Sequence, residues 1–221
     1  MKKTNQKKAV IFDLDGVLVD SGEFHKQSWY DLARAEGFSL TDEFFYSTFG
    51  MQNYQVIPQM LGTDVTPDEI ERLSVLKEQR FRELVAGKLT LLDGVSELIE
   101  KLKGSDFLLA VGSSAPWVNL DFMLRQARID NCFDALVCGD EVTHSKPAPD
   151  TFLKAAEKLS VSPDRCVVVE DAVQGVEAAI AAGMATVAIT TTRSRGQLGQ
   201  ADVIVDSMTE LNADSFEKLL P

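Results

Sequence analysis

The feature that most constrains the fold of this chain is a series of short apolar runs that alternate with amphipathic helical patterns. The apolar runs have the length and residue types of buried strands, and they lie at residues 9–12, 107–111, 135–137, 166–169, 185–189 and 203–205. Apolar residues spaced three and four apart predict helices at residues 94–102, 117–127, 150–159, 173–182 and 209–220. This alternation predicts an α/β fold, a Rossmann-like parallel sheet with helices on both faces.

One long segment, residues 22–89, interrupts this rhythm. It contains no convincing strand, and amphipathic patterns at residues 24–35 and 68–85 predict consecutive helices. Pro67 followed by two acidic residues is typical of a helix N-terminus. We therefore expect an all-helical cap domain at residues 21–90, inserted into a core formed by residues 1–20 and 91–221.

The charge of the chain disfavours several classes of partner. Asp and Glu total 34 against 22 Lys and Arg, a net charge of -12, and no dense basic run follows the N-terminal lysines, so we expect no nucleic-acid partner. No apolar stretch approaches the about 18 residues of a membrane helix, and the first apolar run is too short for a signal peptide. We expect a cytoplasmic monomer without a membrane partner. An acidic surface also means that any phosphate site must gather positive charge locally.

The three cysteines, Cys132, Cys138 and Cys166, are odd in number and lack the paired spacings of zinc sites. Each lies in or beside an apolar stretch. We interpret them as reduced residues of the hydrophobic core.

Two carboxylates follow the first predicted strand in Asp13-Leu14-Asp15-Gly16. Being two residues apart, they point the same way from the carboxyl edge of the sheet, where open α/β sheets bind ligands. Asp13 can attack phosphorus, while Asp15 can protonate the leaving oxygen and later take a proton from water. An Asp-Gly turn without catalytic function is an alternative. A calcium loop is disfavoured because apolar Val17, Leu18 and Val19 follow where ligands are needed.

Two further motifs offer groups for binding phosphate. Ser113 and Ser114 follow the second predicted strand and can supply a hydroxyl and backbone amides, although serine is also a common helix N-cap. Lys146 precedes a proline-stiffened entry into a helix, where its ammonium could neutralise phosphate, although a solvated surface lysine is the simpler alternative.

A second acidic pair, Glu170 and Asp171, stands where the fourth predicted strand gives way to a helix. Asp171 could serve only as a helix cap. Acids that crowd one sheet edge repel one another without a cation, however, and oxygen ligands suit Mg²⁺. We therefore expect Asp13, Asp15, Glu170 and Asp171 to form a magnesium site.

The order of these motifs along the chain resembles that of the haloacid dehalogenase superfamily. Its four motifs match Asp13-Leu14-Asp15-Gly16, Ser113, Lys146 and Glu170-Asp171, and the helical insertion resembles the cap of the phosphatase and β-phosphoglucomutase branch. The resemblance implies that Asp13, the backbone carbonyl of Asp15, and Asp171 hold the metal, with Glu170 assisting directly or through water. It implies that Ser113, the amide of Ser114 and Lys146 bind the transferring phosphoryl group. Dehalogenases of the superfamily lack the second aspartate, so Asp15 argues against dehalogenation.

The resemblance implies a Mg²⁺-dependent phosphatase that acts on a small phosphorylated metabolite, such as a sugar phosphate, through an aspartyl-phosphate. A sugar phosphomutase of the β-phosphoglucomutase type is the main alternative. A non-catalytic binding module is disfavoured by the intact motifs, and phosphonoacetaldehyde hydrolysis through Lys26 stays open.

The cap should select the substrate, and His25, Trp29, Met51, Gln52, Asn53, Lys77, Arg80 and Trp117 are candidates around its mouth. His25 could be a relay or substrate contact, or could simply pack a cap helix. Asn53 stands where β-phosphoglucomutase, aligned by eye, has an arginine that grips the second phosphate, and a neutral amide cannot replace that charge. Pro116-Trp117 likewise replaces a Lys-Asn pair of the mutase. Arg80 or Arg82 could supply a substitute charge, which keeps the mutase alternative open.

Overall fold

The structure, a computed structural model, describes residues 7–62 and 64–221, so part of the N-terminal lysine run lies outside the described residues. Its centre is a six-stranded parallel sheet in the order β3-β2-β1-β4-β5-β6. The strands are β1 (Lys8–Phe12), β2 (Phe107–Gly112), β3 (Ala135–Val137), β4 (Cys166–Glu170), β5 (Ala185–Ile189) and β6 (Val203–Val205). Every strand predicted from an apolar run is present, and the α/β fold is confirmed.

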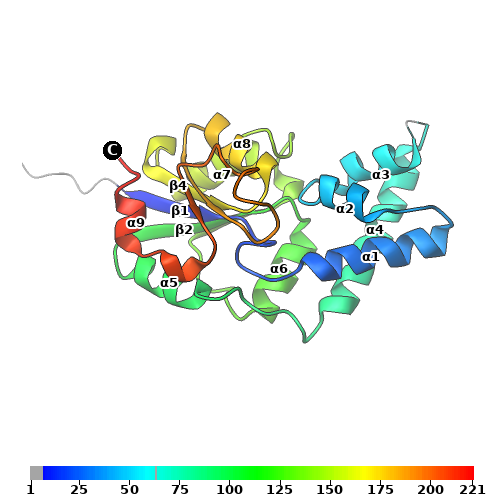
Figure 1. The fold of residues 1–221 in the computed structure, drawn as a ribbon, viewed down its shortest axis with the longest axis horizontal. Helices are drawn as coiled ribbons and strands as arrows, with labels where there is room; N and C mark the ends of the chain where they lie inside the picture. Colours follow the sequence, from blue (N-terminus) through cyan, green and yellow to red (C-terminus); the bar gives the residue numbers. More distant parts are fainter. Residues whose placement is uncertain (1–6, 63) are drawn as a thin grey trace, which may run out of the picture.

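Helices cover both faces of this sheet (Figure 1). They are α5 (Val95–Lys103), α6 (Trp117–Gln126), α7 (Asp150–Leu159), α8 (Val173–Ala181) and α9 (Ala213–Glu217). Successive strand residues point to opposite faces: Val10 and Phe12 join the core beneath α5, α6 and α9, whereas Ala9 and Ile11 join the core beneath α7 and α8. Both faces of the central strand are therefore buried, which explains its unbroken apolar sequence.

The helix predicted for residues 209–220 is wrong in its extent. A 3-10 turn at Met208–Glu210 is followed by the short helix α9. Asn212 adopts an extended backbone, with φ -147° and ψ 175°, and its side chain accepts a hydrogen bond from the backbone N–H of Ser215. Asn212 is therefore an N-cap that starts a new helix, which the apolar periodicity alone did not indicate.

The segment between β1 and α5 is helical, as the missing strand signals predicted. It forms α1 (Gly22–Glu36), α2 (Asp42–Thr48), α3 (Asn53–Leu61) and α4 (Pro67–Val85), which gather at one end of the molecule (Figure 1). These helices have a hydrophobic core of their own, which includes Trp29, Phe45, Ile57 and Leu73. We call α1–α4 the cap helices.

The chain passes between the core and the cap helices at two adjacent crossings. The backbone N–H of Asp20 donates to the carbonyl of Thr90 at 3.1 Å, and Val19 forms an antiparallel bridge with Leu91. The outgoing and returning segments therefore lie side by side. In the part of the chain that the structure describes, none of the helices is both long enough and apolar enough to span a bilayer.

The cysteines are free thiols, as expected, but they do not share one environment. Cys138 and Cys166 are buried, whereas Cys132 is only partly buried beside the core. Burial raises the pKa of the Cys166 thiol to about 12, so this thiol is unreactive at neutral pH.

Candidate active site

The predicted motif residues come together at the carboxyl edge of the sheet. A cavity of about 690 Å³ opens there, and the motif side chains line its core side while residues of all four cap helices, α1–α4, line its cap side. The lining includes Asp13, Asp15, Ser113, Ser114, Lys146, Glu170 and Asp171. Parallel strands bring these residues together because their carboxyl ends meet at one edge.

Lys146 lies at the centre of this group. Its Nζ atom is 2.6 Å from Asp13 Oδ1 and 2.7 Å from Glu170 Oε1, and it also donates to the carbonyl of Gly112 at 3.2 Å. Only 4% of Lys146 is exposed, so the alternative of a solvated surface lysine is wrong. The two carboxylates hold the pKa of Lys146 above its usual range although burial alone would lower it.

The second acidic pair is built into the start of the loop after β4. Glu170 Oε2 accepts hydrogen bonds from the backbone N–H groups of Asp171 and Ala172, at 2.7 and 2.8 Å. Asp171 Oδ2 accepts from the hydroxyl of Thr192 at 2.5 Å. Asp171 therefore is not the N-cap of α8, a position that Ala172 occupies.

Two glycines make room for these carboxylates. A Cβ atom at Gly175 would lie 1.8 Å from Glu170 Oε1, and a Cβ at Gly16 would lie 2.2 Å from Asp171 Oδ2. Gly16 also has a φ of +76°, which favours glycine. Gly16, which follows the first acidic pair, therefore leaves space for Asp171, and Gly175, which follows the second acidic pair, leaves space for Glu170.

Three carboxylate oxygens, one each from Asp13, Glu170 and Asp171, lie within 4.8 Å of one another. Burial raises the pKa of Asp13 to about 7, Lys146 opposes this shift, and Glu170 and Asp15 add to it. Burial and then the charges of Glu170 and Asp13 raise the pKa of Asp171 well above its usual value. The single ammonium of Lys146 does not balance this charge, so the cluster fits a hard divalent cation.

The two serines do not cap a helix. Helix α6 begins at Trp117 with Pro116 at its N-cap, and Ser113 Oγ instead accepts from the backbone N–H of Ala115 at 3.0 Å. The hydroxyl oxygen of Ser114 is buried and has no hydrogen-bond partner among the described residues, although Ser114 as a residue is part of the cavity lining.

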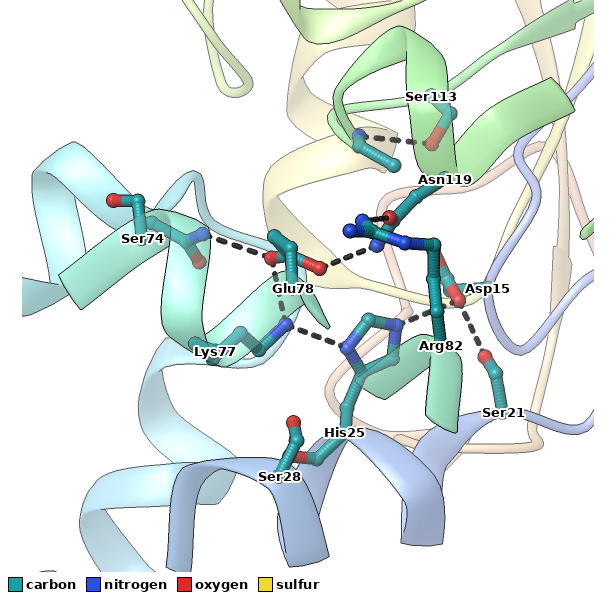
Figure 2. Close-up of polar contacts among 12 residues, drawn as sticks. Asp15, Ser21, His25, Ser28, Ser74, Lys77, Glu78, Arg82, Ser113 and Asn119 are labelled. Atoms are coloured by element: carbon teal, nitrogen blue, oxygen red, sulfur yellow. Dashed lines mark hydrogen bonds and ion pairs between the residues drawn. The ribbon is translucent and has the colours of Figure 1, made fainter. Parts of the chain in front are cut away.

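Asp15 is linked to the cap helices through His25 (Figure 2). Asp15 Oδ1 contacts the hydroxyl of Ser21 and lies 3.0 Å from His25 Nε2, while Lys77 Nζ lies 2.8 Å from His25 Nδ1. Because an ammonium only donates, Nδ1 must accept, and Nε2 therefore carries the hydrogen that faces Asp15. Burial acts to raise the pKa of Asp15, but the contact with His25 and the hydrogen bond from Ser21 hold it below its usual value.

His25 also packs in the cap. Its ring stacks on Phe81 with centroids 3.9 Å apart and ring planes 13° apart. The two interpretations that the sequence left open, a relay and a packing residue, are therefore compatible in this geometry.

The other cap candidates divide by their position. Trp29, Met51, Gln52, Asn53 and Lys77 line the cavity, but Trp117 does not and is 46% exposed. Arg80 also lies outside the lining, because it faces solvent and pairs with Asp31 at 2.7 Å and Glu83 at 3.1 Å. Arg82, the second arginine considered as a substitute charge for the phosphate grip of a mutase, does line the cavity.

Lys26, the residue considered for imine chemistry, lies outside the cavity lining. Its Nζ atom contacts Asp42 Oδ2 at 2.8 Å and lies 5.1 Å from the ring centre of Tyr46. This surface pairing leaves no role for Lys26 in the cavity.

The sequence did not indicate two residues of the site. The hydroxyl of Thr192 donates a hydrogen bond to Asp171. The only feature of the sequence that could have indicated this contact is that Thr192 follows β5 at the same edge of the sheet. Glu78 lines the cavity and contacts side chains from α3, α4 and α6, which no spacing in the sequence indicates.

The fold and site define a class of protein: a parallel α/β core with a lysine and a carboxylate cluster at its carboxyl edge, facing an inserted helical layer. The family model described as haloacid dehalogenase-like hydrolase matches residues 10–189. The chain belongs to this family, as its motifs predicted.

Similar proteins include phosphatases and mutases. The chain is 32% identical over 211 residues to a chloroplastic 5-amino-6-(5-phospho-D-ribitylamino)uracil phosphatase from Arabidopsis thaliana; the match covers 95% of this chain but only 57% of that protein's length. It is 32% identical to β-phosphoglucomutase from Bacillus subtilis, covering 94% of this chain and 92% of that protein. The crystal structure of β-phosphoglucomutase from Clostridium difficile superimposes with a TM-score of 0.89 at 26% identity, covering 97% of both chains.

Proposed function

We propose that this protein is a Mg²⁺-dependent phosphatase that hydrolyses a small phosphorylated metabolite, such as a sugar phosphate, through a phosphorylated Asp13. The observation that carries the proposal is the contact of Asp13 with Lys146 at the wall of the cavity, within a cluster of carboxylates. This arrangement offers a nucleophile and positive charge at the same point. A pure binding module would not need the nucleophile.

Asp13, Asp171 and the backbone carbonyl of Asp15 are the proposed ligands of Mg²⁺. Glu170 already accepts from Lys146 through one oxygen and from two backbone amides through the other, so we assign it contact with the metal through water. When bound, Mg²⁺ would offset the charge of the carboxylates and of the substrate phosphate.

In the first half of the proposed reaction, an Asp13 carboxylate oxygen attacks phosphorus while the bond from phosphorus to the ester oxygen breaks. Lys146, Ser113 and the backbone amide of Ser114 stabilise the charge on the phosphoryl oxygens, and Asp15 gives its proton to the leaving oxygen. In the second half, water attacks the phosphoaspartate, Asp15 takes the proton of that water, and inorganic phosphate leaves. The net reaction consumes one water, frees the Asp13 carboxylate and returns a proton to Asp15.

The environment of Asp15 suits these two roles in turn. His25 favours the ionised form of Asp15, which is the form that accepts a proton from water. A phosphate dianion that binds beside Asp15 adds like charge and raises the pKa of the carboxyl, which favours the protonated form needed in the first half.

A mutase is the second candidate, because relatives with that name are similar and Arg82 lines the cavity. A mutase must hold a sugar bisphosphate in either orientation, so the phosphate not being transferred needs a cation of its own. The neutral Asn53 and the apolar Pro116 argue against it. Net phosphate release is therefore the favoured outcome.

A panel of phosphorylated metabolites, incubated with Mg²⁺, tests the proposal if free phosphate and isomerised products are followed in parallel. We expect phosphate release from at least one small phosphomonoester, with little interconversion of β-glucose 1-phosphate and glucose 6-phosphate. Rapid interconversion without phosphate release, primed by a sugar bisphosphate, would instead assign the mutase. Absence of both reactions across the panel would contradict the proposed enzyme.

A further inference from the structure

The cap side of the cavity contains a buried carboxylate, Glu78, that accepts hydrogen bonds from three donors (Figure 2). Its Oε1 atom accepts from Lys77 Nζ and from Asn53 Nδ2, each at 2.8 Å, and its Oε2 atom accepts from Asn119 Nδ2. Glu78 is 8% exposed, and the lysine and Asn119 beside it are 3% and 0% exposed. Three elements, α3, α4 and α6, thus converge on one carboxylate.

This arrangement fixes the orientation of both amides. An ionised carboxylate only accepts hydrogen bonds, so Asn53 and Asn119 must turn their NH₂ groups toward Glu78. The carbonyl oxygen of Asn119 then accepts from Arg82 at 2.5 Å. The carbonyl oxygen of Asn53 has no donor among the described residues, and Asn53 lines the cavity.

Glu78 therefore removes donors from the cap side of the cavity. Lys77 is occupied by Glu78 and His25, and Asn53 keeps an acceptor free. Arg82 keeps donors of its own, but it lies one helical turn from Glu78, so an anion that approached Arg82 would also approach this carboxylate. A second phosphate would lie beside the Glu78 carboxylate and the free acceptor of Asn53 while Lys77 is already paired, whereas a substrate hydroxyl would meet an acceptor.

We propose that Glu78 is a specificity-determining residue that restricts the enzyme to substrates with a single phosphate, whose hydroxyl-bearing remainder occupies the cap side of the cavity. This inference rests on the proposed phosphatase function. It names a class of substrate, polyol or sugar monophosphates, and a class that is rejected, the corresponding bisphosphates.

A matched pair of substrates tests the inference: fructose 1-phosphate and fructose 1,6-bisphosphate, which differ by one phosphate. The quantity to measure is the ratio of kcat/KM for the bisphosphate to kcat/KM for the monophosphate, because damage to the shared chemistry cancels in this ratio. Wild-type enzyme should favour the monophosphate. In Glu78→Gln the ratio should rise about tenfold, the factor that about 1.4 kcal/mol represents, since a negative charge is lost and Lys77 is released.

Glu83→Gln is the control variant, because it removes the same charge from the same helix at an exposed position outside the cavity lining. Its ratio should stay at the wild-type value. If Glu78→Gln does not fold, the double variant Glu78→Gln with Asn119→Asp replaces it. The new amide at position 78 can then donate to the new carboxylate at position 119, and the negative charge moves to position 119, which lies outside the cavity lining. A rise in the ratio for this double variant supports the inference in the same way.

Binding separates failure of this inference from failure of the proposed function. The shift in Tm caused by each sugar phosphate with Mg²⁺ can be measured in Asp13→Asn, with and without Glu78→Gln. If wild-type enzyme hydrolyses neither compound but Glu78→Gln still strengthens bisphosphate binding selectively, the proposed reaction fails and the role of Glu78 stands. A wild-type preference for the bisphosphate, or an unchanged ratio in both tests, would overturn the inference.

Discussion

The cavity buries charged groups on two sides: the carboxyl edge of the sheet, which carries Asp13, Lys146, Glu170 and Asp171 and is called here the core edge, and the cap side, which carries Lys77 and Glu78. Carboxylates outnumber ammonium groups at the core edge, whereas the two charges of Lys77 and Glu78 balance on the cap side. At the core edge, carboxylates from Asp13, Glu170 and Asp171 crowd within 4.8 Å around one ammonium. On the cap side, Lys77 and Glu78 neutralise each other and every donor facing Glu78 is used. The core edge thus keeps an excess of carboxylates over ammonium groups, whereas Lys77 and Glu78 on the cap side balance each other.

This difference separates two tasks. A site that keeps unbalanced charge can bind a metal and a phosphoryl group, which every substrate of such an enzyme carries. The cap side, where Lys77 and Glu78 are already paired, offers shape, a few free acceptors and the donors of Arg82, so it discriminates among the groups attached to the phosphate. Changes at the core edge should therefore abolish turnover, and changes at the cap side should alter substrate choice.

The sharpest test of the core edge is Asp13→Asn. An amide is nearly isosteric with the carboxylate but is a very poor nucleophile, so we expect kcat to fall at least about 10³-fold while the circular dichroism spectrum is unchanged. Asp15→Asn should also be severely impaired, yet it should form some phosphoenzyme from a substrate with an activated leaving group. Wild-type turnover in Asp13→Asn would rule out the covalent mechanism.

Metal removal tests whether the unbalanced charge of the core edge needs a cation. EDTA should abolish turnover, and added Mg²⁺ should restore it, because four acids converge on one edge and three of them are buried together. Mg²⁺ should also raise the Tm of wild-type protein, since it binds the folded state only, and this shift should be smaller in Asp171→Asn. Full activity after exhaustive chelation would contradict the metal assignment.

Gly175→Ala asks how tightly the core edge is built. The new methyl group would lie where the Glu170 carboxylate now is, so this side chain must move and lose its hydrogen bonds to two backbone amides. We expect a loss of about 2 kcal/mol or more in the free energy of unfolding, measured in urea, together with reduced activity. Gly196→Ala is the control, because a Cβ there meets nothing within 4 Å; its effect should stay within about 0.5 kcal/mol. Equal stability of the two variants would show that the loop after β4 is adaptable.

The core edge could be predicted from the sequence far better than the cap side. Parallel strands deliver their following residues to one edge whatever the detailed packing is, so Asp13, Lys146 and Asp171 could be brought together from the order of the motifs alone. The contacts of Glu78 with Asn53 and Asn119 join residues 25 and 41 positions away in different helices, and they depend on how the helices pack. No local pattern encodes that packing.

The choice between Arg80 and Arg82 was within reach of helix geometry. Residues four apart share a face of a helix, so Glu78 and Arg82 point the same way, whereas a residue two positions from each lies on the far side. The burial of α4 follows this rule, since Lys77, Glu78 and Phe81 are buried and Arg80 is exposed. The inward face could therefore have been identified before the structure was known, although its partners could not.

The smallest expected effects compare these two arginines, and they test whether the function of the cap lies only on its inward face. Arg82 lines the cavity and joins α4 to α6 through Asn119, so Arg82→Gln should raise KM several-fold, by about three to ten times, with a smaller change in kcat. Arg80→Gln loses only exposed ion pairs with Asp31 and Glu83, and such pairs contribute little in water. The KM of Arg80→Gln should match that of wild-type enzyme for every substrate hydrolysed.

Steady-state kinetics on Arg82→Gln and Arg80→Gln with the same monophosphate tests whether only the inward face of α4 contributes to binding, because the substitution is identical and only the face of the helix differs. An equal rise in KM for both would mean that charge anywhere on α4 assists binding at long range, and the division of labour between core edge and cap side would then fail.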